Sequence, residues 1–372
     1  MPDTKISTKE AIMLIISIVI AHTIVTLPVT LLKNSKSGIL VNIVYVSILA
    51  LLFAFILFKL FKKFQGQDII DISDYLGGPF LKNIVGIIFI IYFISSSGIL
   101  LRNFAEGLKV IYFPNTNILY IILSFIITIC ITNSLSFRSN IKVISIILPF
   151  VIVSIFFLFI GNLPSFSFER IFPILGEGVF NTFVVGIGNI IAFSGISCLY
   201  IIPPLLKKPE DFKKIALTGI GISALYLLLC VSTLLFMFSF FLKVDEILPL
   251  YTAASYIEYG TFFQRLDSIF LLIWMLEICC YLTITSKFSS IIFKKMANLK
   301  YQKPLTFIFP LLIFSVALLP KTVAISKLLG NTLYRFISLT VVFGLGLLIL
   351  IFANAKKYRE EKRWKVNLLK YL

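Results

Sequence analysis

Charged and polar residues are scarce in this chain. Charged residues make up 14% of its 372 residues, and it has one histidine and two tryptophans, whereas 59% of the residues are hydrophobic. Runs of about 20 apolar residues recur from end to end, which excludes an ordinary soluble domain and is typical of an all-α membrane protein with many spans. No segment between these runs is long enough to form a soluble domain, so we expect one permease-like membrane domain over residues 1–372.

Motifs of soluble enzymes are missing as well. The sequence has no Walker loop, no HExxH and no nucleophile elbow. Gly186-Ile187-Gly188 lies inside an apolar run with no strand before it, so it is not a dinucleotide loop. The five cysteines all lie in apolar runs and lack metal-ligand spacing, so neither a disulfide framework nor a zinc site is indicated. We therefore predict a protein that is not an enzyme and needs no cofactor or metal.

The apolar runs predict ten membrane spans. Their approximate bounds are 10–32, 39–61, 83–113, 117–132, 141–160, 178–206, 212–242, 264–293, 304–319 and 329–355. The short polar N-terminus leads into the first run without a small-residue cleavage site, so we expect an uncleaved first helix rather than a signal peptide.

The excess of basic residues agrees with a membrane topology and not with nucleic-acid binding. The net charge is +17, but the charges lie in short runs between spans instead of on one amphipathic face. With the N-terminus placed in the cytoplasm, 24 of the 34 lysines and arginines fall in cytoplasmic segments, seven fall outside and three lie within spans. The positive-inside rule then places both termini, and the basic tail 356–372, in the cytoplasm.

The sixth span, 178–206, is apolar but rich in glycine. Gly186, Gly188 and Gly195 lie in its middle, together with Asn189 and Ser194. Glycine costs about 1 kcal/mol in a helix interior, and unwound backbone is tolerated in a membrane only where it is buried or lines a cavity. A glycine-interrupted span therefore indicates a transporter-like substrate site. The alternative is that these small residues only allow close packing of two helices.

The first span is interrupted too. It contains His22-Thr23-Ile24-Val25-Thr26-Leu27-Pro28, and proline inside a helix removes a hydrogen bond and clashes with the preceding turn. Because spans one and six are five apart, we expect a 5+5 inverted repeat over about 8–161 and 178–355, with helices 1 and 6 broken. His22, the only histidine, is expected to form structural hydrogen bonds rather than to act as a ligand or proton relay.

Four ionisable residues inside the spans are candidates for ion or proton coupling, because buried charge in a membrane is costly. Arg102 and Glu106 are four residues apart on one face of span three and could form a structural pair. Asp267 and Glu277 belong to one stripe of span eight, which must face the bundle interior. Glu277 could pair with Arg102, stay protonated, or form a packing hydrogen bond between helices.

Four stretches resemble the permease-like B subunits of bacterial spore germination receptors. They are ISTKEAIMLIISIVIAHTIVTLP at the start, FERIFPILGEG before span six, FSGISCLYIIPPLLKKPEDFKK through it and RLDSIFLLIWML in span eight. The resemblance covers nearly the whole chain in order. It implies the ten-helix inverted-repeat fold of the amino acid–polyamine–organocation (LeuT-type) superfamily, with spans one and six unwound at the site.

The resemblance also implies a biological setting. It suggests a spore inner-membrane protein that acts with an A subunit and a lipoprotein C subunit and senses a small nutrient such as an amino acid. In this family the second residue after FSG is often glutamate, whereas this chain has Ser197, so one charge contact of the pattern is missing.

We therefore predict a nutrient site at mid-membrane between the breaks of spans one and six. Amide groups near Leu27 would hold a carboxylate, and carbonyls near Gly186 would accept hydrogen bonds from an ammonium. The rival hypotheses are an amino-acid transporter driven by H⁺ or Na⁺ through Glu277, and a channel-like subunit whose ligand binds elsewhere. The predicted ligand-binding residues are Thr23, Thr26, Leu27, Gly186, Gly188, Asn189, Phe193, Ser194, Gly195 and Ser197.

Overall fold

The computed structural model describes residues 5–25, 27–238, 248–257, 266–300 and 305–371, and this part of the chain is almost entirely helical. The α-helices are α1 (Thr8–Ile20), α2 (Leu27–Ser35), α3 (Ile39–Phe61), α4 (Ile69–Ile111), α5 (Ile118–Ser134), α6 (Phe137–Gly161), α7 (Phe212–Met237), α8 (Pro249–Ser255), α9 (Leu266–Met296), α10 (Leu305–Leu318), α11 (Val323–Leu329), α12 (Arg335–Ser338) and α13 (Gly346–Tyr371). The 3-10 and π segments are η2 (Ala21–Thr23), η3 (Lys36–Gly38), η4 (Leu163–Ser165), η5 (Phe168–Ile171), η6 (Phe180–Val184), η7 (Val185–Tyr200), η8 (Pro203–Leu205), η9 (Pro209–Asp211), η10 (Gly330–Tyr334) and η11 (Leu339–Leu345).

Several helices begin at polar residues that satisfy their first free backbone amides. Ser7 and Glu10 form a capping box at the start of α1, and Asp68 and Asp71 form another at the start of α4. The side chain of Asn117 accepts a hydrogen bond from a backbone amide in the first turn of α5. Each such cap stabilises its helix by about 1 kcal/mol, which fixes where these helices start.

Each of the ten predicted spans overlaps a helical segment within the described residues. Seven segments within the described residues are long and apolar enough to cross a membrane. The other three predicted spans correspond to the shorter apolar helices α5 and α10 and to the interrupted segment α1–η2–α2. The number of actual crossings and the two repeats stay predictions. The seven long segments are Thr30–Phe61, Ile69–Ile111, Phe137–Gly161, Phe180–Tyr200, Pro209–Met237, Leu266–Met296 and Val323–Lys362.

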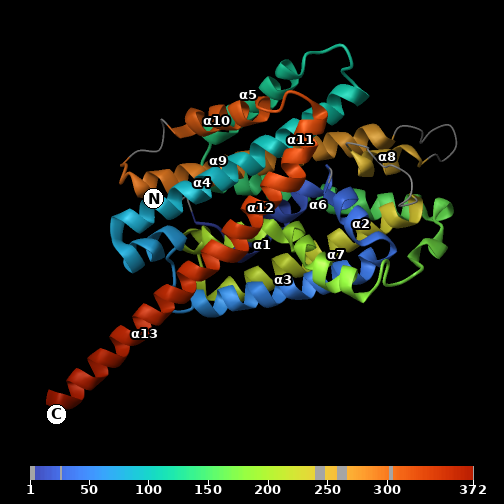
Figure 1. Cartoon of the computed structure of the whole chain (residues 1–372). Coiled ribbons are helices and arrows are strands. Elements are labelled where there is room, and N and C mark those ends of the chain that lie inside the picture. The colour runs from blue at the N-terminus through green and yellow to red at the C-terminus, as the bar shows by residue number, and fades with distance from the viewer. Residues whose placement is uncertain (1–4, 26, 239–247, 258–265, 301–304, 372) are drawn as a thin grey trace.

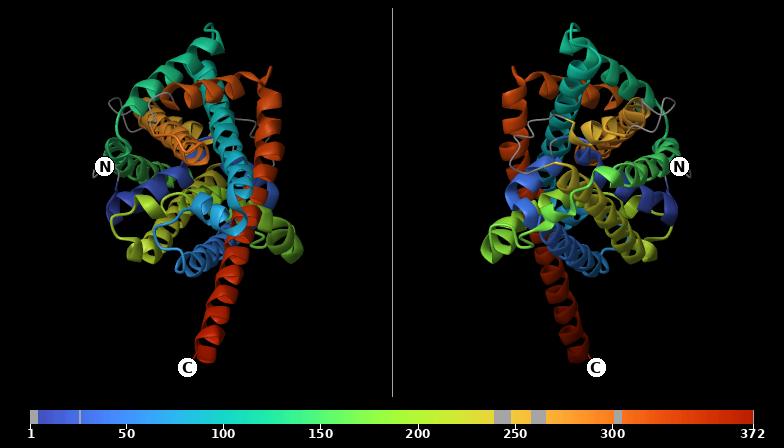
Figure 2. Two further views of the ribbon diagram at one scale, coloured as in Figure 1. Left: turned by 90° about the vertical axis from the view of Figure 1, so that its left-hand side faces the viewer. Right: turned by 90° about the vertical axis from the view of Figure 1, so that its right-hand side faces the viewer.

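The helices pack in two groups. Helices α4, α5, α9 and α10 contact one another, and α1, α3, α7 and η7 form the second group. In Figure 1 the first group lies in the upper half of the molecule and the second in the lower half, and α13 extends away from both. In Figure 2 the teal helix α4 lies beside the red C-terminal segment, and α13 contacts α4. Segments η10 and η11 contact α4, and η11 also contacts η7, so the C-terminal span bridges the two groups.

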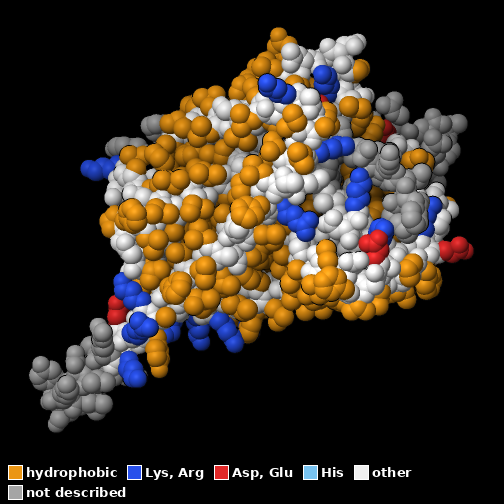
Figure 3. Space-filling model, viewed as in Figure 1, with side chains coloured by type: hydrophobic (Ala, Val, Ile, Leu, Met, Phe, Trp, Pro, Cys, Tyr) orange, Lys and Arg blue, Asp and Glu red, His pale blue; other side chains and the backbone are white. Residues whose placement is uncertain are grey.

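The outer surface is apolar, as lipid tails require. Phe150, Phe157 and Ile146 are 60%, 68% and 66% exposed. Figure 3 shows hydrophobic side chains over most of one face, with lysines and arginines gathered where α13 leaves the bundle and towards the opposite end. An apolar surface of this extent would aggregate in water, so the chain is an integral multi-pass membrane protein.

The first span breaks where the sequence predicts, and the sixth is kinked at one residue. Helix α1 ends at Ile20, and α2 begins only at Leu27. The sixth span consists of the π turn η6 and the 3-10 helix η7, and a kink with non-helical backbone at Phe193 divides η7, whereas the backbone at Gly186 and Gly188 stays wound. The amide of Asn42 accounts for part of this, because it donates hydrogen bonds to the carbonyls of Thr182 and Gly186, at 2.7 and 3.1 Å.

The N-terminal segment is fastened to the end of the sixth span. Ile6 donates a backbone hydrogen bond to Leu205 and accepts one from Lys207, at 2.8 and 2.9 Å, which forms an isolated parallel bridge. The Thr8 hydroxyl donates to the Asp211 carboxylate at 2.6 Å. We call this connection the N-terminal latch. It closes the bundle at the end of α1 that lies away from the helix break.

Candidate functional site

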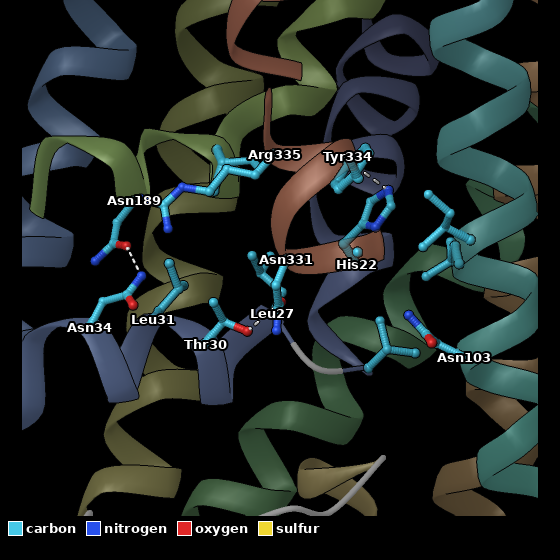
Figure 4. Close-up of a pocket in the computed structure, with 15 residues that line it drawn as sticks. His22, Leu27, Thr30, Leu31, Asn34, Asn103, Asn189, Asn331, Tyr334 and Arg335 are labelled. Atoms are coloured by element: carbon cyan, nitrogen blue, oxygen red, sulfur yellow. Dashed lines mark hydrogen bonds between the residues drawn. The ribbon is translucent and has the colours of Figure 1, made fainter. Parts of the chain in front are cut away.

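A cavity opens beside the break in the first span. The volume in it that is open to the centre of a water molecule is about 40 Å³. Figure 4 shows its polar side chains, which come from both sides of the break, from α4, from η7 and from the start of the C-terminal span. The lining residues are His22, Val25, Leu27, Thr30, Leu31, Asn34, Ile99, Leu100, Asn103, Asn189, Ile191, Gly330, Asn331, Tyr334 and Arg335.

His22 lies at the inner end of this cavity and joins three other elements. Its Nε2 atom lies 3.0 Å from the Tyr281 hydroxyl of α9 and 3.3 Å from the hydroxyls of Ser96 in α4 and Tyr334 in η10. The imidazole also stacks on the Tyr334 ring, with centroids 5.0 Å apart and planes 16° apart. The expected structural hydrogen bonds are present, and the same side chain lines the cavity.

Ser194 connects the sixth span to this cluster. Its hydroxyl lies 2.8 Å from the Tyr334 hydroxyl, and its carbonyl accepts a hydrogen bond from Tyr92 at 3.1 Å. Phe193 is fully buried at the bend of η7, and Ser197 is buried with no hydrogen bond from its hydroxyl within the described residues. These three predicted ligand residues pack behind the cavity and do not line it.

Gly195 marks the closest approach of η7 to α1. A Cβ atom placed on this glycine would lie 2.7 Å from both the Cα and the backbone nitrogen of Val19. Real Cβ atoms essentially never come that close to backbone, so α1 can occupy its position only because residue 195 has no side chain. The glycine therefore sets the distance between the first and sixth spans.

Asn189 is held by a network of amides. Its Nδ2 donates to Asn42 at 2.7 Å and to Ser35 at 3.0 Å, and its Oδ1 accepts from Asn34 at 3.0 Å. Asn42 also uses the Gly186 carbonyl, so that carbonyl, predicted to accept from a ligand ammonium, already has a protein partner. Asn189 and Asn34 line the cavity, whereas Gly186 is buried behind them.

The predicted ligand-binding residues thus divide into three sets. Leu27 and Asn189 line the cavity. Thr26 lies outside the described residues. The others support the site from behind: Thr23, whose hydroxyl donates to the Ile20 carbonyl at 2.6 Å, and Gly186, Gly188, Phe193, Ser194, Gly195 and Ser197.

The start of the C-terminal span contributes residues that the sequence analysis missed. Asn331, Tyr334 and Arg335 all line the cavity, and Thr30 donates a hydrogen bond to Asn331 at 3.0 Å. The sequence does contain a sign of this part of the site. Gly330-Asn331-Thr332 interrupts an apolar run, as the glycines of span six do. The π turn η10 that includes these residues is also typical of functional sites.

Arg102 and Glu106 form a buried structural pair outside the cavity. The guanidinium lies 2.8 Å from the Glu106 carboxylate and donates to the Ala317 carbonyl at 3.2 Å, which ties α4 to α10. The alternative pairing of Arg102 with Glu277 is wrong, because Glu106 on the same helix face occupies the guanidinium.

Replacing Glu106 with leucine is expected to destabilise the protein by about 3–5 kcal/mol, because the Arg102 charge would remain buried without its partner. Thermal unfolding of the purified chain in detergent measures this. A double variant, Glu106→Leu with Arg102→Met, is the control and should recover most of the loss. A double variant as unstable as the single one would contradict the prediction.

Glu277 is fully buried between α9 and α1. Its Oε1 accepts a 2.5 Å hydrogen bond from Ser17, while Oε2 has no hydrogen-bond partner within the described residues. Asp267, at the start of the same helix, accepts from the Tyr251 hydroxyl of α8 at 2.8 Å. Burial, together with this hydrogen bond, raises the pKa of Tyr251 above its ordinary value.

The whole stripe of span eight that the sequence predicts to face inwards is buried. Besides Asp267 and Glu277 it contains Trp274, Tyr281 and Thr285, and none of the five is more than 7% exposed. Only Tyr281 reaches the cluster at the cavity, through His22.

Two groups of helices around a broken first span define a membrane transporter fold of the LeuT type. A Na⁺-coupled sialic acid symporter, solved in a substrate-bound outward-open state, shares it with a TM-score of 0.68 at 10% identity, over 95% of this chain and 79% of that one. A mutant of the manganese transporter of Eremococcus coleocola gives a TM-score of 0.57 at 16% identity, over 93% and 76%. At such identities the likeness concerns the fold alone.

Within this class, the chain belongs to the spore germination protein family, whose model matches residues 5–324. It is 23% identical to spore germination protein YndE of Bacillus subtilis over 368 residues, which cover 97% of this chain and 99% of YndE. Spore germination protein B2 of Bacillus subtilis is 21% identical over 229 residues, covering 60% and 61% of the two chains. The family expected from the sequence is thereby confirmed.

Proposed function

We propose that this chain is the membrane subunit of a nutrient germinant receptor. It binds a small nutrient, an amino acid in the simplest case, in the cavity beside the break of the first span, and binding triggers germination. The observation that carries the proposal is the cavity itself. Its largely apolar wall carries several polar side chains, it lies at the interruption of an apolar span, and it takes residues from both groups of helices.

The arrangement supports a simple mechanism. Asn189 belongs to η7 in one helix group and Asn103 belongs to α4 in the other, while His22, in η2 after α1, contacts side chains of α4 and α9. A ligand that contacts both groups favours the arrangement in which its contacts are complete, and this differential affinity shifts the population of conformers. The positive dipole end at the start of α2, where Pro28 itself has no backbone N–H, would add a favourable position for a carboxylate.

Membership of the spore germination protein family supports a proposed setting. The chain would reside in the spore inner membrane with both termini in the cytoplasm, next to an A subunit and a lipoprotein C subunit. Those partners would receive the conformational signal.

Germination of spores that lack this chain, across a panel of amino acids, sugars and nucleosides, tests the proposal. We expect selective loss of the response to one nutrient class, restored by the wild-type gene. Normal germination on every nutrient, combined with lost uptake of a solute in growing cells, would overturn the receptor function.

That second outcome would favour an H⁺- or Na⁺-coupled amino-acid transporter. Glu277 is the observation in its favour, because a fully buried carboxyl group with one hydrogen bond, to Ser17 of α1, is placed where protonation could be linked to movement of the first span. Uptake by the purified chain in liposomes, with and without an imposed proton gradient, measures this activity.

A further inference from the structure

Arg335 has the most unusual environment of the charged residues near the cavity. It is the first residue of α12 and follows directly on the π turn η10. It lies 12 residues beyond the start of α11, about 18 Å along the helix, and is therefore well inside the segment Val323–Lys362. Figure 4 shows the side chain extending from this helix towards Asn189 at the cavity wall.

The Arg335 guanidinium has no protein partner within the described residues. It forms no hydrogen bond and no ion pair there, although it is only half-buried in a predicted membrane span. Arg102, by contrast, has both Glu106 and the Ala317 carbonyl. An arginine inside a membrane costs several kcal/mol unless an anion or polar acceptors compensate it, so Arg335 is a functional candidate.

The cavity contains nothing that would compete with an incoming anion. None of its lining residues within the described part of the chain is aspartate or glutamate, and Arg335 is the one lining residue with a permanent positive charge. The neighbouring amides of Asn34 and Asn189 are hydrogen-bonded to each other and so do not occupy the guanidinium. The fixed charge of the cavity wall is therefore positive.

Gly188 provides the space for the guanidinium. A Cβ atom placed on this residue would lie 2.1 Å from the Arg335 Nη2 atom, so the terminal group lies directly against the η7 backbone. An alanine here would not meet backbone atoms, and only the flexible end of the arginine would have to move. The missing side chain at Gly188 therefore leaves room for the Arg335 guanidinium, and the fold of the sixth span does not require it.

We propose that Arg335 binds the carboxylate of the ligand, which makes the nutrient a small carboxylate, amino acids included. Two guanidinium N–H groups would donate to the two carboxylate oxygens, the geometry that arginine favours. The rest of the molecule would lie towards His22 and Tyr334. This assignment rests on the proposed function and names the chemical class of its ligand.

The test compares a nutrient carboxylic acid with its primary amide, using spores that contain the complete receptor. In wild-type spores we expect the half-maximal concentration of the amide to be about tenfold or more above that of the acid, because the amide lacks the negative charge of the carboxylate. Arg335→Gln should raise the half-maximal concentration of the acid by about 10- to 100-fold and leave that of the amide nearly unchanged, so that the discrimination disappears. Arg335→Lys, which keeps the charge without the planar fork, should give an intermediate value.

Two further variants keep the test falsifiable if Arg335→Gln does not accumulate. Gly188→Ala should displace the guanidinium and raise the half-maximal concentration of the acid, with no additional effect in an Arg335→Gln background. Lys321→Gln removes one exposed positive charge outside the cavity and should leave both dose responses unchanged.

The outcomes separate the inference from the function on which it rests. Unchanged acid-to-amide discrimination in accumulated Arg335→Gln and Gly188→Ala proteins would overturn the carboxylate assignment. A chain-dependent response confined to uncharged nutrients would do the same. If germination on every nutrient is independent of this chain, the receptor function itself fails.

Discussion

Spores in which Gly195 is replaced by leucine are expected not to respond to the nutrient that triggers wild-type spores. The first atom of any new side chain would lie 2.7 Å from the backbone of Val19, so α1 and η7 would have to separate. Backbone atoms cannot move aside as the end of a flexible side chain can. Even small additions to a packed interior typically lower the free energy of unfolding by about 1–3 kcal/mol. The separation would displace Ser194 from Tyr334, and with it one wall of the site.

A matched control is available in the same group of helices. A Cβ atom on Gly221, in α7, would meet no atom within 4 Å, so Gly221→Leu should accumulate and germinate normally. Gly195→Ala should already raise the half-maximal nutrient concentration by about tenfold or more. Immunoblots of spore membranes separate loss of protein from loss of response. A normal dose response in Gly195→Leu spores would refute the role assigned to the contact between spans one and six.

Glu277 should tolerate glutamine and not alanine. Glutamine keeps an oxygen that can accept the 2.5 Å hydrogen bond from Ser17, so we expect a germination response within about twofold of wild type. Alanine would leave the Ser17 hydroxyl without its acceptor and create a cavity between α9 and α1. Together these effects are expected to cost about 2–5 kcal/mol and to prevent accumulation.

The same pair of variants separates the receptor from the coupled transporter. A proton-coupling carboxyl cannot be replaced by an amide, so a transporter would lose gradient-driven uptake in Glu277→Gln while the protein remained abundant. Germination assays and liposome uptake on the same variant measure both. Abundant Glu277→Gln protein that supports no germination would contradict the receptor mechanism and favour proton coupling.

The membrane architecture was largely predictable because its signals are local. Apolar run length, capping residues such as Ser7 and Asp68, and the proline at residue 28 act within a few residues along the chain. The predicted spans consequently coincide with helical segments, and the first break lies between Ile20 and Leu27.

The details of the site were less predictable because they depend on pairing between distant segments. Asn42 donates hydrogen bonds to two carbonyls of the sixth span from about 140 residues away in sequence. From the sequence, the partner of Arg102 could be Glu106 or Glu277, and the choice depends on where Glu277 packs, which is against Ser17 of α1. Tyr334 and Arg335 were not predicted because the interruption at Gly330-Asn331-Thr332 does not show which neighbouring side chains reach the cavity.

The N-terminal latch and the long α13 together suggest how the molecule transmits force. With the chain clamped between Ile6 and Leu205, the end of α1 remote from the break is fixed, so motion at the break is directed towards the opposite end of the bundle. There the C-terminal span begins, and after η11 it continues as α13, 26 residues or about 39 Å long. A tilt of about 10° at the start of α13 would then displace the tip of this helix by about 7 Å (Figure 1).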